Sequence, residues 1–175
     1  MEYNVIFNLN CMAPYMQTIP ITKSGKEALE KTLAKLKKVD RPQIIEEISV
    51  ARELGDLKEN AEYHAAREKQ GLTEALIRDL EDKICRFQVI DISKIPNNGK
   101  VLFGCYVVLE NQETEQQTSY QIVGEDESDV EQNKISVTSP LARAVIGKEE
   151  GDSIEVKLPK GIALYEIIKV SYNKS

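Results

Sequence analysis

The chain has 175 residues, of which 41% are hydrophobic, 30% charged and 6% aromatic, and its formal net charge is −6. This composition predicts a folded protein of one large or two small domains and excludes a chain that is disordered by composition. No apolar run approaches the ~18 residues of a membrane-spanning helix, and the first residues lack the basic start of a secretory signal, so we expect a cytoplasmic protein with no membrane partner.

The charges divide the chain into two unlike halves. Residues 16–90 contain 14 basic and 14 acidic residues, whereas residues 91–175 contain 9 basic and 14 acidic residues. Most of the glycines and β-branched residues also fall in the second half. This change predicts a boundary at residues 91–98, between a helical domain and a globular domain.

Two helices are predicted in the first half. Thr22 is a candidate N-cap for the first helix, whose apolar stripe consists of Leu29, Leu33, Leu36, Ile44 or Ile45, Ile48 and Ala51. The stripe changes phase at Pro42, which removes a backbone hydrogen bond and should bend the helix without necessarily ending it.

The second helix has a longer and more regular seam than the first. Its members alternate spacings of three and four: Tyr63, Ala66, Gln70, Thr73, Ile77, Leu80, Ile84 and Phe87. This pattern indicates a coiled coil, and the short link at residues 54–57 forces the two helices to be antiparallel neighbours. We expect this helix to span residues 57–90, or roughly 50 Å at ~1.5 Å per residue.

The second half is predicted to be a small α+β domain with a mostly antiparallel sheet. The expected strands are residues 101–109, 118–123, 135–137, 154–158 and 162–170. Ser139 and Pro140 begin a short capped helix that ends before Gly147. We expect the acidic run at residues 125–131 to be a solvated loop.

The cysteines and the only histidine indicate no metal or redox site. Cys11, Cys85 and Cys105 are widely spaced and form no CxxC pair, so neither a disulfide framework nor a zinc site is supported. We expect free thiols, no tightly bound cofactor, and a packing or surface role for His64.

The link between the two helices, which we call the tip (residues 53–60), admits two interpretations. In the first, Gly55 ends the first helix, Asp56 is the N-cap of the second, and Glu59 completes a capping box. Such caps are the more common reason for this spacing. In the second, Asp56 and Glu59 lie on one face and are metal ligands. Two carboxylates cannot complete a Mg²⁺ site, so the other oxygens would come from a partner and its phosphates.

Positive charge flanks the tip at Arg52, Lys58 and Arg67. These side chains would suit a polyanion, although scattered Lys and Arg residues more often form a solvated face with local ion pairs. The acidic net charge argues against binding of free nucleic acid.

Three runs of the sequence resemble the bacterial GreA/GreB transcript cleavage factors. They are ARELGDLKENAEYHAAREKQG at residues 51–71, VIDISKIPNNGKVLFG at 89–104 and TSPLARAVIGKEEGD at 138–152. The likeness covers residues 16–170 or so and leaves residues 1–15 unmatched. We expect Met16 to be the natural start and residues 1–15 to be a flexible extension. A mass measurement on the native protein that showed residues 1–15 intact would refute the first expectation.

The resemblance implies an N-terminal antiparallel coiled coil at residues 16–90 and an FKBP-like domain at residues 91–175 that docks at the rim of the RNA polymerase secondary channel. The coiled coil would then reach the 3′ end of backtracked RNA. Asp56 and Glu59 would be the catalytic pair, helping to hold the second Mg²⁺ together with polymerase carboxylates and positioning the attacking water. The protein would act as a monomer that stimulates the polymerase's own nuclease and is not itself an enzyme.

The resemblance also assigns surfaces for RNA and polymerase. Arg52, Lys58 and Arg67 match a basic patch that meets the RNA, and Ser139 and Pro140 match the docking loop. Two alternatives remain open: a regulator that binds the channel without donating a metal ligand, and an independent peptidyl-prolyl isomerase, for which fold analogy is a weak argument.

Overall fold

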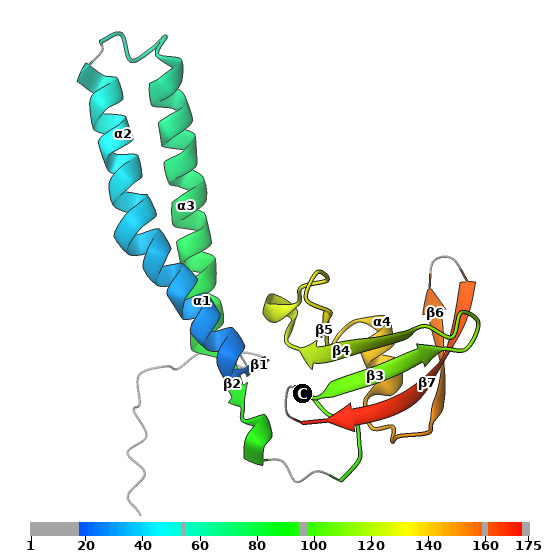
Figure 1. The fold of residues 1–175 in the computed structure, drawn as a ribbon. Helices are drawn as coiled ribbons and strands as arrows, with labels where there is room; N and C mark the ends of the chain where they lie inside the picture. The colour runs from blue at the N-terminus through cyan, green and yellow to red at the C-terminus, as the bar shows by residue number, and fades with distance from the viewer. Residues whose placement is uncertain (1–17, 54, 95–97, 159–160, 173–175) are drawn as a thin grey trace, which may run out of the picture.

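The computed structural model describes residues 18–53, 55–94, 98–158 and 161–172. It is an α+β protein in which a long helical hairpin (residues 23–86) projects from a separate sheet domain (residues 98–172), as Figure 1 shows. None of its described helices is long and apolar enough to cross a membrane. The predicted extension at residues 1–15, with Cys11, lies outside the described residues.

The first arm of the hairpin is one continuous helix made of three segments. These are α1 (Lys23–Lys35), the π-helical turn η1 (Leu36–Asp40) and α2 (Arg41–Glu53). Thr22 is the N-cap, as predicted, and its Oγ1 accepts a hydrogen bond of 3.0 Å from the Gly25 amide. The helix continues through Pro42, and the irregularity takes the form of the π-helical turn that ends two residues before it.

The second arm, α3 (Ala61–Arg86), is shorter than the predicted helix at both ends. Its N-cap is Asn60, and residues after Arg86 form the strand β2 (Phe87–Ile90). This strand pairs in parallel with β1 (Ile19–Thr22). The expectation that the helix reaches residue 90 was therefore wrong, because the partner strand of these β-prone residues lies far away in the sequence.

The predicted seam joins the two arms. Ile44, Ile48 and Ala51 of α2 are buried, and so are Ala66, Ile77 and Leu80 of α3. Ion pairs border this narrow core, and the Arg41 guanidinium donates two hydrogen bonds of 2.7 Å to the Glu74 carboxylate. This contact lowers the pKa of Glu74 below its usual range.

In its described residues, the sheet domain contains five strands and one short α-helix over a single core. The strands are β3 (Tyr106–Asn111), β4 (Gln117–Val123), β5 (Lys134–Ser136), β6 (Ser153–Leu158) and β7 (Gly161–Ser171). Their order is β5-β4-β3-β7-β6, and all neighbours are antiparallel except β4 and β5. The helix α4 (Pro140–Val145) contributes the buried residues Ala142 and Val145 to the core. The fold class predicted from the sequence is confirmed.

Two details of the predicted sheet domain change. The strand expected at residues 101–109 begins only at Tyr106, because Gly104 adopts a φ of +86° and the Val101 amide donates to the Lys148 carbonyl. Cys105, next to that glycine, is a buried free thiol whose pKa is raised by burial, and Cys85 is an exposed free thiol. The proposed domain boundary at residues 91–98, which includes the short helical turn η2 (Ile92–Lys94), stays a prediction.

The acidic run was expected to be solvated, and this is wrong for two of its members. The run begins with a helical turn, η3 (Glu125–Glu127), that lies against the base of the hairpin. Asp126 pairs with Lys83 of α3 at 2.7 Å, and Glu127 accepts a 2.9 Å hydrogen bond from the Thr22 amide. Both partners, Lys83 and Thr22, lie far from the acidic run in the sequence. Composition alone therefore predicted a solvated loop.

Candidate functional site at the hairpin tip

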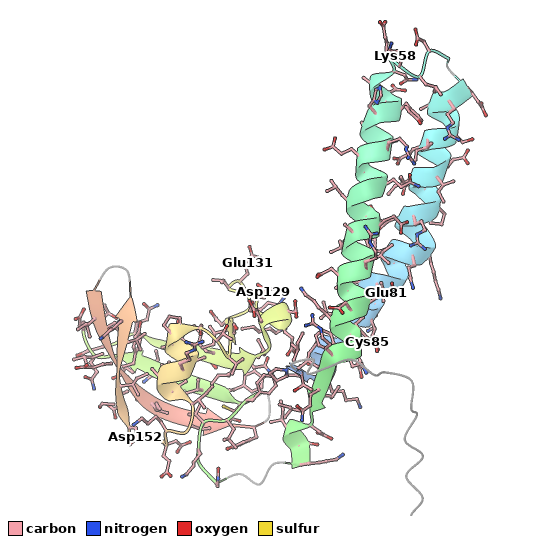
Figure 2. All side chains as sticks on the ribbon, turned by 180° about the vertical axis from the view of Figure 1, so that it is seen from behind. Lys58, Glu81, Cys85, Asp129, Glu131 and Asp152 are labelled. Carbon is pink, nitrogen blue, oxygen red and sulfur yellow. The ribbon has the colours of Figure 1, made fainter. Side chains whose placement is uncertain are left out.

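The tip lies at the end of the hairpin farthest from the sheet domain (Figure 1). Helix α2 ends at Glu53 and α3 begins at Ala61, and the described residues 55–60 connect them. Gly55 has a φ of +80°, the left-handed conformation that commonly follows a helix C-terminus. Figure 2 shows Lys58 at the outer limit of the turn.

A single asparagine holds the turn together. The Asn60 Oδ1 accepts a hydrogen bond of 3.0 Å from the Tyr63 amide, which makes Asn60 the N-cap of α3. Its Nδ2 donates a hydrogen bond of 2.9 Å to the Ala51 carbonyl in the opposite arm. The capping box predicted for Asp56 and Glu59 is therefore wrong, because Asn60 caps the helix instead.

Both tip carboxylates are exposed. The Glu59 amide donates to the Asp56 carbonyl at 3.2 Å, so the two residues share one backbone turn. Neither carboxylate forms a hydrogen bond or an ion pair with any residue that the structure describes. Both negative charges are thus available to a ligand from outside the chain.

The backbone at Asp56 is itself unusual, with a φ of +27°. Residues other than glycine seldom adopt this region, although Asp and Asn enter it more readily than most. Conformations of this kind cost free energy and occur preferentially at functional sites. The strain at Asp56 marks the same residue that the sequence singled out.

Two of the three basic residues near the tip line one groove. Arg52 and Arg67 line a common groove of about 250 Å³ between the two arms, together with Ile45, Ile48, Ser49 and Gln70. The Arg52 guanidinium lies 5.9 Å from the centre of the Tyr63 ring, and Arg67 donates a hydrogen bond to Gln70. Lys58 does not line this groove.

The aromatic residues near the tip have structural roles. Tyr63 packs against the buried cluster of Ile44, Ile48 and Ala66, as the seam predicted. His64 is exposed, and its Nε2 lies 3.1 Å from the carbonyl oxygen of Lys58. This contact confirms a polar surface role.

The residues expected to dock on a partner lie in the sheet domain, well away from the tip. Ser139 is the N-cap of α4, and its Oγ accepts a hydrogen bond of 3.2 Å from the Ala142 amide. Pro140 is the first residue of the helix and is exposed. The structure therefore separates the tip residues from Ser139 and Pro140, and the roles assigned to both groups stay predictions.

Asn60 was missed by the sequence reasoning, although a signal for it existed. Asparagine is among the best N-cap residues, and Asn60 directly precedes the first turn of α3. The Asp56 and Glu59 pair also had the spacing of a capping box. The helix was therefore predicted to start at residue 57, four residues before its observed start at Ala61.

Comparisons with known proteins agree with this architecture. The family description "Transcription elongation factor, N-terminal" matches residues 19–89, and "Transcription elongation factor, GreA/GreB, C-term" matches residues 96–172. Proteins called "Transcription elongation factor GreA" from Francisella tularensis subsp. novicida (strain U112) and subsp. tularensis (strain SCHU S4 / Schu 4) are 56% identical over 154 residues. That length is 88% of this chain and 96% of theirs.

A solved structure that is similar over most of the chain superposes only loosely on it. It is GreA factor homolog 1 (Gfh1) of Thermus thermophilus, 25% identical, which covers 88% of this chain and 99% of that chain with a TM-score of 0.40. The sequence matches, by contrast, extend over both the hairpin and the sheet domain. The chain therefore belongs to the GreA/GreB family of transcription elongation factors.

Proposed function

We propose that this elongation factor binds RNA polymerase, inserts the hairpin through the secondary channel and stimulates the polymerase's own cleavage of backtracked RNA. The supporting observation is that the carboxylates of Asp56 and Glu59, in the turn between the two arms, are exposed and have no partner among the residues that the structure describes. Capping by Asn60 leaves both of them free to act on something outside the chain.

The chemistry of the pair fits part of a divalent-cation site. Mg²⁺ takes six oxygen ligands and keeps several waters, so two carboxylates can supply only some of them. Within the described residues, no group of three or more His, Cys, Asp and Glu side chains is placed to hold a metal ion. The tip would therefore add ligands to a site whose other oxygens belong to polymerase carboxylates and RNA phosphates.

The chain's contribution to cleavage is to hold ligands and to orient water. A second Mg²⁺, when bound there, stabilises the charge that develops as the phosphodiester is hydrolysed. A free carboxylate oxygen of Asp56 or Glu59 accepts a hydrogen bond from the attacking water and so fixes its direction. The nuclease is the polymerase, and this protein stimulates it.

The other assigned residues would guide the two macromolecules. The groove with Arg52 and Arg67, and Lys58 at the end of the turn, would contact phosphates near the 3′ end of the backtracked RNA. Ser139 and Pro140 would dock the sheet domain at the channel rim. With a net charge of −6, one copy of the chain would meet RNA only inside the polymerase, since binding to free nucleic acid needs a basic surface.

The decisive experiment uses a backtracked elongation complex and the double variant Asp56→Asn with Glu59→Gln. The variant should lower the rate of RNA cleavage at least about 100-fold, because metal ligation is worth several kcal/mol of charge stabilisation. Raising the Mg²⁺ concentration should recover part of the loss. The matched control is Glu46→Gln with Glu68→Gln, which removes two exposed acids from the arms of the same hairpin and should cleave normally.

The same experiment addresses the alternative of a regulator that occupies the channel without donating a metal ligand. If the double variant changed transcription as the unaltered chain does, the carboxylates would have no role in cleavage and that alternative would stand. An equal loss in the control pair would show that general charge, and not the tip, is responsible.

A further inference from the structure

One side chain of the sheet domain is bound into the base of the hairpin, and the proposed function gives it no role. The Glu127 Oε1 accepts hydrogen bonds of 2.9 Å from the amides of Thr22 and Gly124. Its Oε2 accepts a hydrogen bond from the Thr22 hydroxyl. A single carboxylate therefore joins the first residues of the hairpin to the turn that follows β4.

The surroundings make this contact stronger than an ordinary surface interaction. Thr22 is only 2% exposed, and hydrogen bonds to a charged acceptor are about twice as strong as neutral ones. Thr22 is also the N-cap of α1, so the negative charge of Glu127 lies at the helix end where the backbone dipole favours it.

Two glycines allow the domains to approach this closely. A methyl group on Gly25, in the first turn of α1, would overlap the Glu127 carboxylate. A methyl group on Gly124 would lie 2.5 Å from the Pro20 carbonyl oxygen. The contact between the two domains is therefore closely fitted, against a side chain at Gly25 and against the backbone at Gly124.

A second link from the same turn reaches the other arm of the hairpin. Asp126 pairs with Lys83 of α3 at 2.7 Å, and Asp79 pairs with the same ammonium group at 3.1 Å. Hydrogen bonds to Asp126 first, and then to Asp79, raise the pKa of Lys83. Because Glu127 binds the first arm and Asp126 the second, the turn resists rotation of the hairpin as well as its separation.

We propose that Glu127 is a positioning residue: with Asp126 it fixes the direction of the hairpin relative to the sheet domain, and so fixes where the tip carboxylates arrive. Its effect on cleavage rests on the proposed function, whereas the fixed direction is a property of the chain alone. The two can therefore be tested separately.

The length of the hairpin makes this direction important. From Lys83 to Ala61 is 22 residues of α3, or roughly 33 Å at ~1.5 Å per residue. A rotation of only about 10° at the base would thus move the tip by roughly 6 Å, well beyond the ~2.1 Å length of a Mg²⁺–oxygen bond. A loosely attached hairpin could not hold the carboxylates in place.

The fixed direction can be measured in the full chain with two spin labels. Glu68→Cys in α3 and Lys157→Cys in β6 provide exposed attachment sites, one in each domain. Cys11→Ser and Cys85→Ser remove competing thiols, and Cys105 is buried. We expect a single narrow distance distribution by pulsed electron resonance.

Two variants should disrupt that distribution by different routes. Gly25→Ala expels the carboxylate yet favours helix formation in α1, so its effect cannot come from a failing helix. Glu127→Ala removes the carboxylate directly. Both should broaden or shift the distance distribution. Glu127→Gln keeps one side-chain oxygen that can accept hydrogen bonds from the Thr22 and Gly124 amides, so it should preserve much of the narrow distribution.

Matched controls accompany each variant. Gly71→Ala places the same methyl group in α3, where nothing lies within 4 Å. Glu131→Gln removes a charge from an exposed position of the same acidic loop (Figure 2). Both controls should keep the narrow distance. If Gly25→Ala and Glu127→Ala kept it as well, the proposal that Glu127 fixes the direction of the hairpin would be disproved.

The cleavage assay then tests the consequence for function. Gly25→Ala should lower the maximal cleavage rate about 100-fold, the loss that a misplacement of about 1 Å can cause. The concentration for half-maximal effect should change little, because the surface of α4 is unaltered. Normal cleavage by a variant with a broad distance would overturn the positioning role. Failure of the unaltered chain to stimulate cleavage would instead refute the proposed function and leave the distance measurement valid.

Discussion

Asn60 uses both ends of its side-chain amide, and this determines what the neighbouring acids can do. Its oxygen caps α3 through the Tyr63 amide, and its nitrogen binds the Ala51 carbonyl of the opposite arm. With the helix end satisfied in this way, Asp56 and Glu59 are not needed as caps for α3.

This division of roles predicts effects of different size on stability. Asn60→Ala should lower the free energy of unfolding by about 1–2 kcal/mol, because the N-cap is lost and a bond between the arms goes with it. Glu59→Ala should change it by no more than about 0.5 kcal/mol, the usual range at exposed positions. Urea denaturation followed by circular dichroism measures both. Equal losses would mean that Glu59 belongs to a capping box after all.

At the scale of elements, the first arm shows how an irregular seam is accommodated. From Leu36 to Ile44 the apolar stripe advances eight residues, where a heptad repeat advances seven. The π-helical turn η1 takes up the extra residue, with the Arg41 amide donating to the Leu36 carbonyl five residues earlier. The apolar positions on both sides of η1 can therefore face the same partner helix.

Removing one residue from the turn should thus be tolerated. Deletion of Val39, which is 54% exposed, should convert η1 to α-helix and leave the seam in register, with most of the thermal stability retained. Deletion of Glu46, an exposed residue of α2, should rotate Ile48 and Ala51 out of the seam and unfold the hairpin. Melting curves of the two deletions compare them directly, and similar losses would contradict this account of η1.

The elements that the sequence predicted correctly are those whose signals are local. The α3 seam, the Thr22 cap and the Ser139 cap of α4 each depend on residues within a few turns of one another. The pairing of β1 with β2 and the binding of Glu127 to Thr22 join residues 68 and 105 positions apart, and no local pattern specifies such contacts. For the candidate site, local spacing singled out Asp56 and Glu59, whose role stays a prediction, but not the asparagine that caps α3 in their place.

At the scale of the whole molecule, the regions assigned to docking and to cleavage lie in different domains. The start of α4 belongs to the sheet domain, whereas the tip is at the opposite end of the hairpin (Figure 1). The contacts of Asp126 and Glu127 lie between them. In this arrangement, attachment to the polymerase and action on its active centre should be separable by mutation.

The double variant Asp56→Asn with Glu59→Gln should therefore act as a competitor. In the unaltered chain, the two tip acids have no partners among the described residues. Their replacement should therefore leave the fold and the proposed docking surface intact. Added in equal amount to the unaltered chain at saturating concentration, the variant should halve the rate of RNA cleavage.

Adding Pro140→Glu should abolish the competition, because it places a charge on the proposed docking surface at a helix start that tolerates acids. The exposed change Glu113→Lys in the β3–β4 turn is the control and should leave the competition unchanged. If excess double variant left cleavage untouched, the tip carboxylates themselves would be needed for attachment, and the separation of the two regions would be wrong.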